Sequence, residues 1–402
     1  MTMIPIRTLW RKIRKRLAKK AFIENLGGGR RDLSLRALLY YKNEPYWDPV
    51  AVSESAHTNL WEIIELQHIL NRLGFVVDAI DRDCDGVDVS NKYDLFLGLG
   101  AGNSGRHFVR LAEQARSAVK IMLAMGPAPD LSNTLVEERY AAFRQRTGVA
   151  APSMRTVTKV TGDRFLAIAD LADYIFAIGE PQSFSPQTYL EYGKPVLTFM
   201  PGVSSGVGFQ PRWLRTRKRN TFLCFAGNGF ICKGVDLLVE AFEQMPDMQL
   251  VICGPDSEPA FFETYGQRIE ASANISYRGF ISVGSKDFAQ LCAECSYTIL
   301  HSSSEGCATS VATCLCAGLP PLVSHATSID VREFGWILPD KDNIRGIVDT
   351  VRMAASVSDT EYRRRAMRTL DDAQRYSRSN YTATMTSNII QVLSENLDRF
   401  GA

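Results

Sequence analysis

Two charged residues in the second half of the sequence stand where they could bind an anionic ligand. Lys233 lies in a glycine-rich turn before an expected helix, and Glu305 precedes Gly306 in a polar turn before another. A lysine ammonium can neutralise a diphosphate, and a carboxylate beside it suits a ligand that also carries hydroxyls, as a nucleotide-sugar does. The alternatives, a surface lysine at a helix start and a helix-capping acid, remain open.

The residues around Glu305 predict a βαβ unit. An apolar, β-prone run at 297–300 is followed by the polar turn 301–306 and a small-residue helix at 308–317. Gly318 and Pro320 end that helix, and a second buried strand follows at 321–324. Ligands of open α/β sheets bind at such strand–helix turns, and a helix N-terminus offers amide groups and a positive dipole to a phosphate.

The rest of the second half repeats this rhythm. The turn that holds Lys233 lies between an expected strand and an expected helix, and further strands and helices follow. The stretch 361–400 is helical and charged, and is expected to pack on the outside. The predicted strands are 221–226, 249–253 and 275–280, and the predicted helices are 235–244 and 285–294.

The first half alternates in the same way, which indicates a parallel, doubly wound sheet. Its predicted strands are 35–41, 75–81, 93–99, 119–124, 173–178 and 195–199, and its predicted helices are 61–73 and 106–118.

Two loops of the first half are candidates for substrate contact. In the loop 53–59, His57, Thr58 and Asn59 either touch a substrate or cap the following helix. The loop 100–105 matches G-x-G-x-x-G between a strand and a helix.

A dinucleotide site at 100–105 is disfavoured, because the loop does not follow the first strand of its domain and the next strand ends without an acid for a ribose. A slim loop facing an interdomain cleft, with Gly102 and Asn103 on the acceptor side, is favoured instead. His107 is either an acid/base or acceptor contact, or an ordinary histidine at a helix start.

The composition is that of a soluble globular protein with two domains. The chain has 402 residues, 45% of them apolar and 22% charged, and a net charge of +2. This charge argues against a general nucleic-acid binder, and no apolar run reaches the length of a membrane span. The nine cysteines suggest reduced thiols in a cytosolic protein. Cys292-x-x-Cys295 lacks a second ligand pair at zinc spacing, so core packing is favoured over metal binding.

The N-terminal segment differs from the rest. Residues 7–20 hold eight basic residues and no acid, and Leu9, Trp10, Ile13 and Leu17 share one helical face. This pattern suits an anionic membrane surface, and a solvated basic tail is the alternative. No apolar core of signal-peptide length is present, so export is not indicated.

Five segments are expected along the chain. They are a basic N-terminal segment at 1–34, a first α/β domain at 35–200, a linker at 201–220, a second α/β domain at 221–385 and a C-terminal helix at 386–402.

Five motifs in the second half carry a resemblance to a known family. In order they are Gly227 with Lys233–Leu238, Leu250–Gly254, Arg278–Phe280, Ser304–Gly306 and Ala317–Pro320. Their order and spacing over about residues 221–340 resemble the group 1 (family 4) retaining glycosyltransferases of GT-B fold. This resemblance implies two Rossmann-like domains facing a cleft, of which the first binds the acceptor and the second the nucleotide-sugar.

The resemblance also implies roles for residues. Lys233 would bind the diphosphate, the backbone at 306–310 would meet the phosphates or sugar, Glu305 would hold sugar hydroxyls, and the loop at Phe280 would contact the base. Glu305, Lys233 and His107 are the candidate catalytic residues. The candidate donor-binding residues are Gly227, Asn228, Gly229, Lys233, Gly254, Phe280, Glu305, Gly306, Cys307, Ala308, Thr309 and Thr313.

Two positions depart from the family pattern. Members often carry an arginine where this chain has Asn228, and a second, ribose-binding glutamate where it has Thr313. A hydroxyl replaces only part of a carboxylate's interaction with a ribose diol. His301 stands where a proline is common.

The expected function is sugar transfer with retention from a nucleotide-sugar to a glycan or lipid-linked acceptor. No metal or other cofactor is expected, since no acidic pair stands out as a metal site and Asp81-Arg82-Asp83 is interpreted as a solvated turn. A role in surface polysaccharide biosynthesis, in the cytoplasm or at the inner face of the plasma membrane, follows from the basic segment. A catalytically silent GT-B protein and a sugar-nucleotide epimerase are the alternatives.

Overall fold

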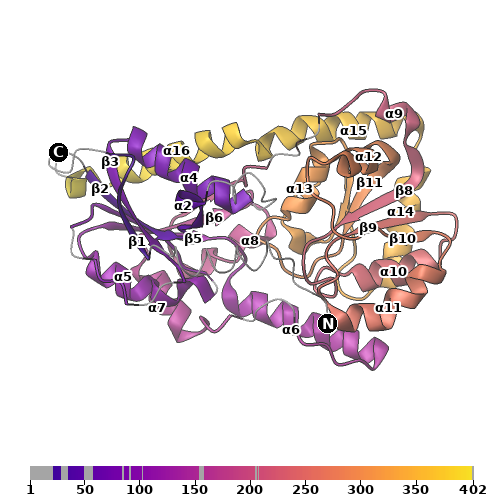
Figure 1. Cartoon of the computed structure of the whole chain (residues 1–402), viewed down its shortest axis with the longest axis horizontal. Helices are drawn as coiled ribbons and strands as arrows, with labels where there is room; N and C mark the ends of the chain where they lie inside the picture. The colour runs from indigo at the N-terminus through magenta and orange to yellow at the C-terminus, as the bar shows by residue number, and fades with distance from the viewer. Residues whose placement is uncertain are drawn as a thin grey trace. The chain divides into compact units, whose positions relative to one another are not determined.

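The chain forms two mostly parallel sheets with helices, so the α/β fold class is confirmed (Figure 1). The structure, a computed structural model, describes residues 21–28, 35–48, 58–83, 86–89, 92–101, 103–153, 158–203, 206 and 208–400. The basic segment 7–20 and His57 therefore lie outside the described residues.

The first sheet has seven strands in the order β1-β3-β2-β4-β5-β6-β7. Strand β2 pairs in parallel with β3 and β4, which confirms the predicted parallel core. The order reverses between β2 and β4, so the loop that begins at Gly100 lies at the switch point of this sheet. The strands are β1 (Phe22–Leu26), β2 (Leu35–Tyr41), β3 (Phe75–Asp81), β4 (Leu95–Leu99), β5 (Val119–Ala124), β6 (Tyr174–Ile178) and β7 (Val196–Phe199).

Strand β1 was not expected, because residues 1–34 were interpreted as one basic segment. It pairs antiparallel with β3, and the Asn25 amide donates to Asp78 Oδ1 at 2.8 Å. Asp78 is fully buried in β3, where Arg36 and the Tyr93 hydroxyl also donate to it. A buried carboxylate needs such partners, so Asp78 fixes β1 to the sheet.

The predicted helices 61–73 and 106–118 correspond to α4 and α5, whereas α2, α6, α7 and α8 were not predicted. Helix α6 was not predicted, although Pro129 at its start and Gly148 in the left-handed region at its end are standard helix limits. Its buried apolar stripe, Val136, Tyr140 and Phe143, is narrow and most of its other residues are polar, so the apolar periodicity that signals a helix is weak. The helices are α2 (Glu44–Trp47), α4 (Thr58–Arg72), α5 (Phe108–Gln114), α6 (Pro129–Thr147), α7 (Asp163–Leu171) and α8 (Phe184–Gln187).

The second sheet has six strands in the order β10-β9-β8-β11-β12-β13, all paired in parallel. Numbered along the chain, this is the Rossmann order 3-2-1-4-5-6, and the order reverses between β8 and β11. The strands are β8 (Lys218–Phe225), β9 (Gln249–Cys253), β10 (Ile275–Tyr277), β11 (Cys295–Leu300), β12 (Pro321–Val323) and β13 (Trp336–Ile337).

The predicted helices 235–244, 285–294 and 308–317 correspond to α10, α12 and α13, and the predicted helical stretch 361–400 holds α15 and α16, whereas α9, α11 and α14 were not predicted. Within the described residues, no helix is long and apolar enough to cross a bilayer. The helices are α9 (Trp213–Thr216), α10 (Val235–Glu243), α11 (Pro259–Ala271), α12 (Lys286–Glu294), α13 (Thr309–Leu315), α14 (Ile344–Ser356), α15 (Asp359–Ala373) and α16 (Arg378–Glu395).

The chain divides into two compact units at other points than the predicted boundaries. The first unit holds 1–123, 162–176 and 382–402, and the second holds 124–161 and 177–381. Helix α6 therefore belongs to the same unit as β8–β13. The predicted boundary at 385 falls inside α16, and β8 begins at Lys218, inside the predicted linker.

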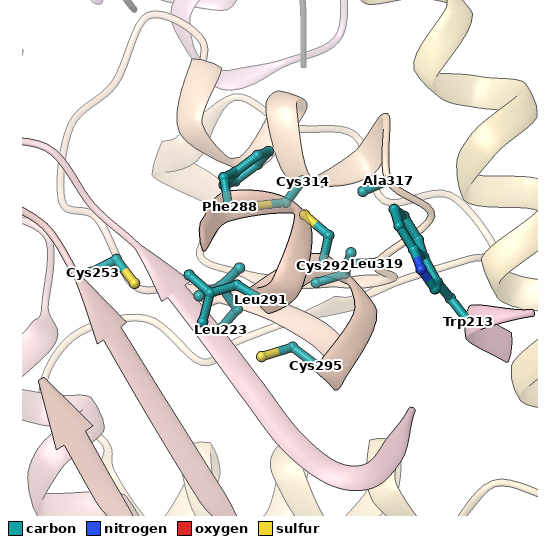
Figure 2. Close-up of a cluster of buried hydrophobic side chains, with 10 residues drawn as sticks. All are labelled: Trp213, Leu223, Cys253, Phe288, Leu291, Cys292, Cys295, Cys314, Ala317 and Leu319. Atoms are coloured by element: carbon teal, nitrogen blue, oxygen red, sulfur yellow. The ribbon is translucent and has the colours of Figure 1, made fainter. Parts of the chain in front are cut away.

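The core of the second unit contains a cluster of cysteines (Figure 2). Cys292 and Cys295 lie beside Cys253, Cys314 and apolar side chains such as Leu223. Burial raises the pKa of Cys253 and of Cys292 to about 12, so these thiols stay protonated and pack as small apolar groups. No disulfide joins the cysteines of the described residues. The predicted packing role of the C-x-x-C pair is confirmed by its place in this core.

Arg217 belongs to the expected basic linker but has a structural role. It is 6% exposed, and its guanidinium donates to the carbonyls of Cys292 at 2.9 Å, Gly318 at 2.8 Å and Ala317 at 2.6 Å. These carbonyls lie at the C-terminal ends of α12 and α13, where acceptors lack partners within the helix. One side chain thus caps two helices.

Replacing Arg217 with methionine should lower the free energy of unfolding by about 3 kcal/mol or more, because three buried carbonyls lose their donor. Urea denaturation measures the change. Arg215→Met is the matched control, since Arg215 is exposed in the same short segment, and its effect should stay within about 0.5 kcal/mol. Equal stability of the two variants would contradict the capping role.

Candidate functional site

The two central strands of the second sheet bring Lys233 and Glu305 together. Strands β8 and β11 are neighbours with Tyr297 opposite Phe222, so the loops after them lie at the same sheet edge. The Ser303 amide donates to the Cys232 carbonyl at 3.0 Å across these loops. The site therefore lies at the point where the strand order reverses, which is where open α/β sheets bind ligands.

Close packing of these loops requires a glycine at 234. Gly234 has a φ of 67°, and a Cβ built on it would lie 2.3 Å from the His301 carbonyl oxygen. A larger residue would push the two loops apart. The backbone directly after Lys233 is thus fixed against the end of β11.

Lys233 and Glu305 form an ion pair in the structure. The lysine Nζ donates to Glu305 Oε1 at 2.5 Å, and the two side chains are 16% and 13% exposed. The Ser302 hydroxyl donates to the same carboxylate oxygen at 2.9 Å. An ammonium has three donors, so Lys233 can hold Glu305 and still donate to a ligand.

The backbone around Glu305 is held by the turn η3 (His325–Thr327). The amide of Glu305 donates to the Ala326 carbonyl at 2.9 Å and the amide of Ala308 to the Thr327 carbonyl at 3.0 Å. The Ser328 hydroxyl donates to the Glu305 carbonyl at 3.1 Å. The Ala308 amide is therefore occupied, and a ligand would have to use other amides of the segment 306–310.

Packing inside the protein, rather than a ligand, requires a glycine at position 306. A Cβ built on it would lie 2.4 Å from the Met125 carbonyl oxygen and 2.7 Å from Ile178 Cγ2. The close backbone approach that the sequence suggested is therefore an approach to other residues of the second unit.

The other residues predicted to bind the nucleotide-sugar differ in how exposed they are. Gly227 and Asn228 are exposed, Gly229 is buried, and the Ser257 hydroxyl donates to Asn228 Oδ1 at 2.9 Å. A Cβ on Gly227 would lie 3.9 Å from Lys233 Cε. The exposed edge of this loop thus lies beside the lysine.

Residues of the neighbouring loops differ in accessibility. Strand β10 ends at Tyr277, earlier than predicted, and leaves Phe280 68% exposed after it. Gly254 follows β9, and its carbonyl accepts from the Tyr277 hydroxyl at 2.8 Å. Phe280 is thus an exposed aromatic ring at the edge where a base could stack.

Helix α13 carries the last predicted donor residues. Cys307 and Ala308 are buried, and Thr309 is half-buried at the helix start. Thr313 is 5% exposed, and its hydroxyl donates to the Thr309 carbonyl at 2.8 Å. That hydroxyl can still accept a hydrogen bond from a ligand, but it offers one oxygen where a glutamate carboxylate would offer two to the ribose diol.

The candidates of the first half lie in the first compact unit. Thr58 begins α4, and Asn59 follows it. Asn103 begins the turn η1 (Asn103–His107), and Gly102 lies outside the described residues. His107 is half-buried; its Nε2 accepts from Arg106 Nε at 2.9 Å, and its ring packs edge-on against Tyr40.

The slim loop at 100–105 has an internal explanation. A Cβ built on Gly105 would lie 2.0 Å from the Gly100 carbonyl oxygen, so the loop folds tightly on itself. Gly105 is needed for this packing, whatever faces the loop.

Helix α6, which the sequence did not predict, positions the Lys233 loop. Arg139 and Arg146 both form ion pairs with Asp236, which is fully buried in the first turn of α10. The Tyr140 hydroxyl donates to Glu258 Oε1 at 2.5 Å, and Glu258 Oε2 accepts from the Ile231 amide at 2.9 Å. Burial raises the pKa of Glu258, and these two hydrogen bonds act against that rise.

Comparison with known proteins agrees with this geometry. Residues 209–354 match the family model described as glycosyl transferases group 1. This region is a group 1 glycosyltransferase domain. No curated protein sequence matches the chain.

Solved structures show that the chain containing this glycosyltransferase domain has the GT-B fold. Sucrose-phosphate synthase from Thermosynechococcus elongatus matches with a TM-score of 0.61 at 13% identity, covering 90% of this chain and 100% of that one. Trehalose-6-phosphate synthase matches with a TM-score of 0.57 at 10% identity, covering 90% and 99%. WaaG, a glycosyltransferase involved in lipopolysaccharide biosynthesis, matches with a TM-score of 0.53 at 13% identity, covering 89% and 99%. The resemblance to group 1 glycosyltransferases of GT-B fold is confirmed, and retention at the anomeric carbon stays a prediction.

His301 gives the glycosyltransferase domain a specific pH dependence. It is 5% exposed, and its Nε2 contacts the Pro339 carbonyl at 2.7 Å. A carbonyl only accepts, so Nε2 carries the proton. Burial lowers the pKa of His301 below 6.5. Below pH 6.5 the unfolded chain therefore binds a proton that the folded chain does not, and stability falls as pH decreases.

Replacing His301 with glutamine should flatten the loss of stability below pH 6.5. One such histidine contributes a slope of up to about 1.4 kcal/mol per pH unit. Urea denaturation at several pH values from 7.5 downward measures the slope. His68→Gln is the control, because His68 is exposed, and it should keep the wild-type slope. An unchanged slope in His301→Gln would contradict the assignment.

Proposed function

We propose that this glycosyltransferase moves a sugar from a nucleotide-sugar to a glycan or lipid-linked acceptor, with retention at the anomeric carbon. The observation that supports this proposal is the Lys233–Glu305 ion pair at the strand-order reversal. One partner suits a diphosphate and the other suits sugar hydroxyls, so the pair matches the two ends of such a donor.

The leaving group determines what the site must do. When the sugar–phosphate bond breaks, negative charge develops on the nucleoside diphosphate, and fixed positive groups lower the barrier. Lys233 supplies a charge held by a rigid loop, and amides at the start of α13 add partial positive charge. We propose that this arrangement works without a metal ion, since Lys233 supplies the neutralising charge.

Donor binding should replace the contact between Lys233 and Glu305 by contacts of each residue with the nucleotide-sugar. A diphosphate carries more charge than one carboxylate and competes for the Lys233 ammonium. Glu305, still held by the Ser302 hydroxyl, then accepts hydrogen bonds from the sugar. In the absence of a donor, the same two groups neutralise one another.

Two residues favour a second candidate, a catalytically silent nucleotide-sugar-binding protein. Asn228 lacks the positive charge of the family's arginine, and Thr313 offers one hydroxyl oxygen where the family's glutamate offers a charged carboxylate to the ribose. Release of nucleoside diphosphate only when acceptor is present separates a transferase from this candidate. A changed sugar-nucleotide without acceptor would indicate an epimerase.

Lys233→Ala and Glu305→Gln should each lower turnover by about 10²–10³-fold, because each removes a fixed electrostatic contact to the transition state. Release of nucleoside diphosphate from a panel of UDP-, GDP-, ADP- and dTDP-sugars, with glycan acceptors, measures the loss. Lys286→Ala, which removes an exposed lysine at the start of α12, is the control and should keep full turnover. Wild-type turnover in either site variant would refute the proposed roles.

We also propose that the acceptor is reached at the cytoplasmic face of the plasma membrane, in surface polysaccharide biosynthesis. Residues 7–20 supply the positive charge that anionic lipids attract. His107, with the acceptor-side residues His57, Thr58, Asn59, Gly102 and Asn103, remains the proposed acceptor contact.

Deletion of residues 1–20 should abolish binding to vesicles that contain anionic lipid, since each basic residue near the surface adds about 1 kcal/mol. The deletion stops before Phe22 because β1 begins there. Co-sedimentation with phosphatidylglycerol-containing vesicles measures binding, and phosphatidylcholine vesicles serve as the uncharged control. Equal binding by the full and shortened chains would contradict a membrane role.

A further inference from the structure

A pocket of about 810 Å³ lies beside the Glu305 loop. All of its lining residues belong to the second compact unit. Its walls come from α6, from α8, from the turn after β11, from η3 after β12 and from residues 340–342. Ser302 lines it and also donates to the Glu305 carboxylate. We call it the α6 pocket; neither Lys233 nor Glu305 is among its lining residues.

The serine hydroxyl groups in the wall of the α6 pocket donate hydrogen bonds to other groups of the protein. Ser302 donates to Glu305, Ser303 to the Cys232 carbonyl at 3.1 Å, and Ser324 to the Ser302 carbonyl at 2.6 Å. A hydroxyl that has donated keeps its lone pairs. This side of the pocket therefore offers acceptors at fixed positions, which match ligand hydroxyl groups.

The charges of the lining balance, which disfavours a phosphate. Arg139 and Arg146 are committed to Asp236, and Arg146 also pairs with Asp342 and Glu240. A phosphate would meet carboxylates beside cations that already have partners. The lining cations are Arg139, Arg146 and Lys341, and the lining carboxylates are Glu138, Asp340 and Asp342.

One part of the lining is apolar and aromatic. The half-buried Phe184 packs its ring edge-on against His325, with ring centroids 5.8 Å apart. Leu135, Ala142 and Ala326 add apolar surface. Binding sites combine such surfaces with a few placed polar groups, and a pyranose ring offers C–H groups on its faces and hydroxyls at its rim.

We propose that the α6 pocket binds a neutral saccharide unit separately from the phosphate site at Lys233. Fixed acceptors, balanced charge and an aromatic side wall all select an uncharged polyol. The role of this saccharide as part of the acceptor rests on the proposed function, whereas its binding does not. Ser302 lines the pocket and donates to Glu305, so a saccharide bound there would lie next to the proposed reacting centre.

Adjacent alanines of α6 provide a matched test. Ala142 lines the pocket and is half-buried, whereas Ala141 is exposed and does not line it. Phenylalanine at 142 should fill part of the pocket, and at 141 should point to solvent. The probes are methyl glycosides of glucose, galactose, mannose, rhamnose and N-acetylglucosamine, measured by saturation-transfer NMR on the full chain.

The proposal expects saturation transfer to at least one glycoside in the wild type, in Ala141→Phe and in Lys233→Ala, and its loss in Ala142→Phe. Absence of transfer in the wild type, persistence in Ala142→Phe or loss in Lys233→Ala would overturn it. Binding of UDP, GDP and ADP, measured on the same variants, should be lost in Lys233→Ala and kept in the wild type, Ala141→Phe and Ala142→Phe. Failure of the donor site and failure of this pocket are therefore distinguishable.

His325→Ala decides the question if Ala142→Phe does not fold. His325 is exposed and lines the pocket, so its removal should leave the fold intact. Loss of one hydrogen-bonding partner should weaken glycoside binding by about 3–10-fold. Unchanged affinity in His325→Ala would overturn the proposal.

Discussion

The parallel pairing of β8 with β11 is the constraint on which the candidate site depends. Strand order reverses between these neighbours, so the helices that follow them leave the sheet in different directions and open a gap at its edge. Lys233 and Glu305 are separated by 72 positions in the chain. They meet because each lies in the loop directly after one of these two strands.

Contacts with the surrounding loops and helix fix the positions of Lys233 and Glu305. The close approach of Gly234 to His301 fixes one loop, and the hydrogen bonds to η3 fix the other. Helix α6 adds a third support through Asp236 and Glu258. Fixed charges stabilise a transition state better than mobile ones, because they need no reorganisation during the reaction. An ion pair on such a scaffold is suited to a donor that is anionic at one end and polyhydroxylated at the other.

Local patterns in the sequence predicted the described strands except β1 and β13, the helices α4, α5, α10, α12, α13, α15 and α16, and the two loops at the site. Apolar runs, terminal glycines and the order of five motifs all act over short distances. Helix α6 was missed because its apolar stripe (Val136, Tyr140 and Phe143) is narrow and its other residues are mostly polar, and Arg139 and Arg146 resembled surface charges. Their partner Asp236 is 97 and 90 positions away and resembled an ordinary acid at a helix start. Strand β1 was missed because its pairing depends on the distant Asp78. Long-range polar contacts leave no such local signal.

Hydrogen–deuterium exchange with a panel of UDP-, GDP-, ADP- and dTDP-sugars tests the central claim most directly. A nucleotide-sugar that binds at the Lys233–Glu305 pair should slow exchange in both loops, 227–234 and 301–309, because both become ordered around one ligand. Binding of a nucleotide-sugar that leaves exchange in both loops unchanged would contradict the account.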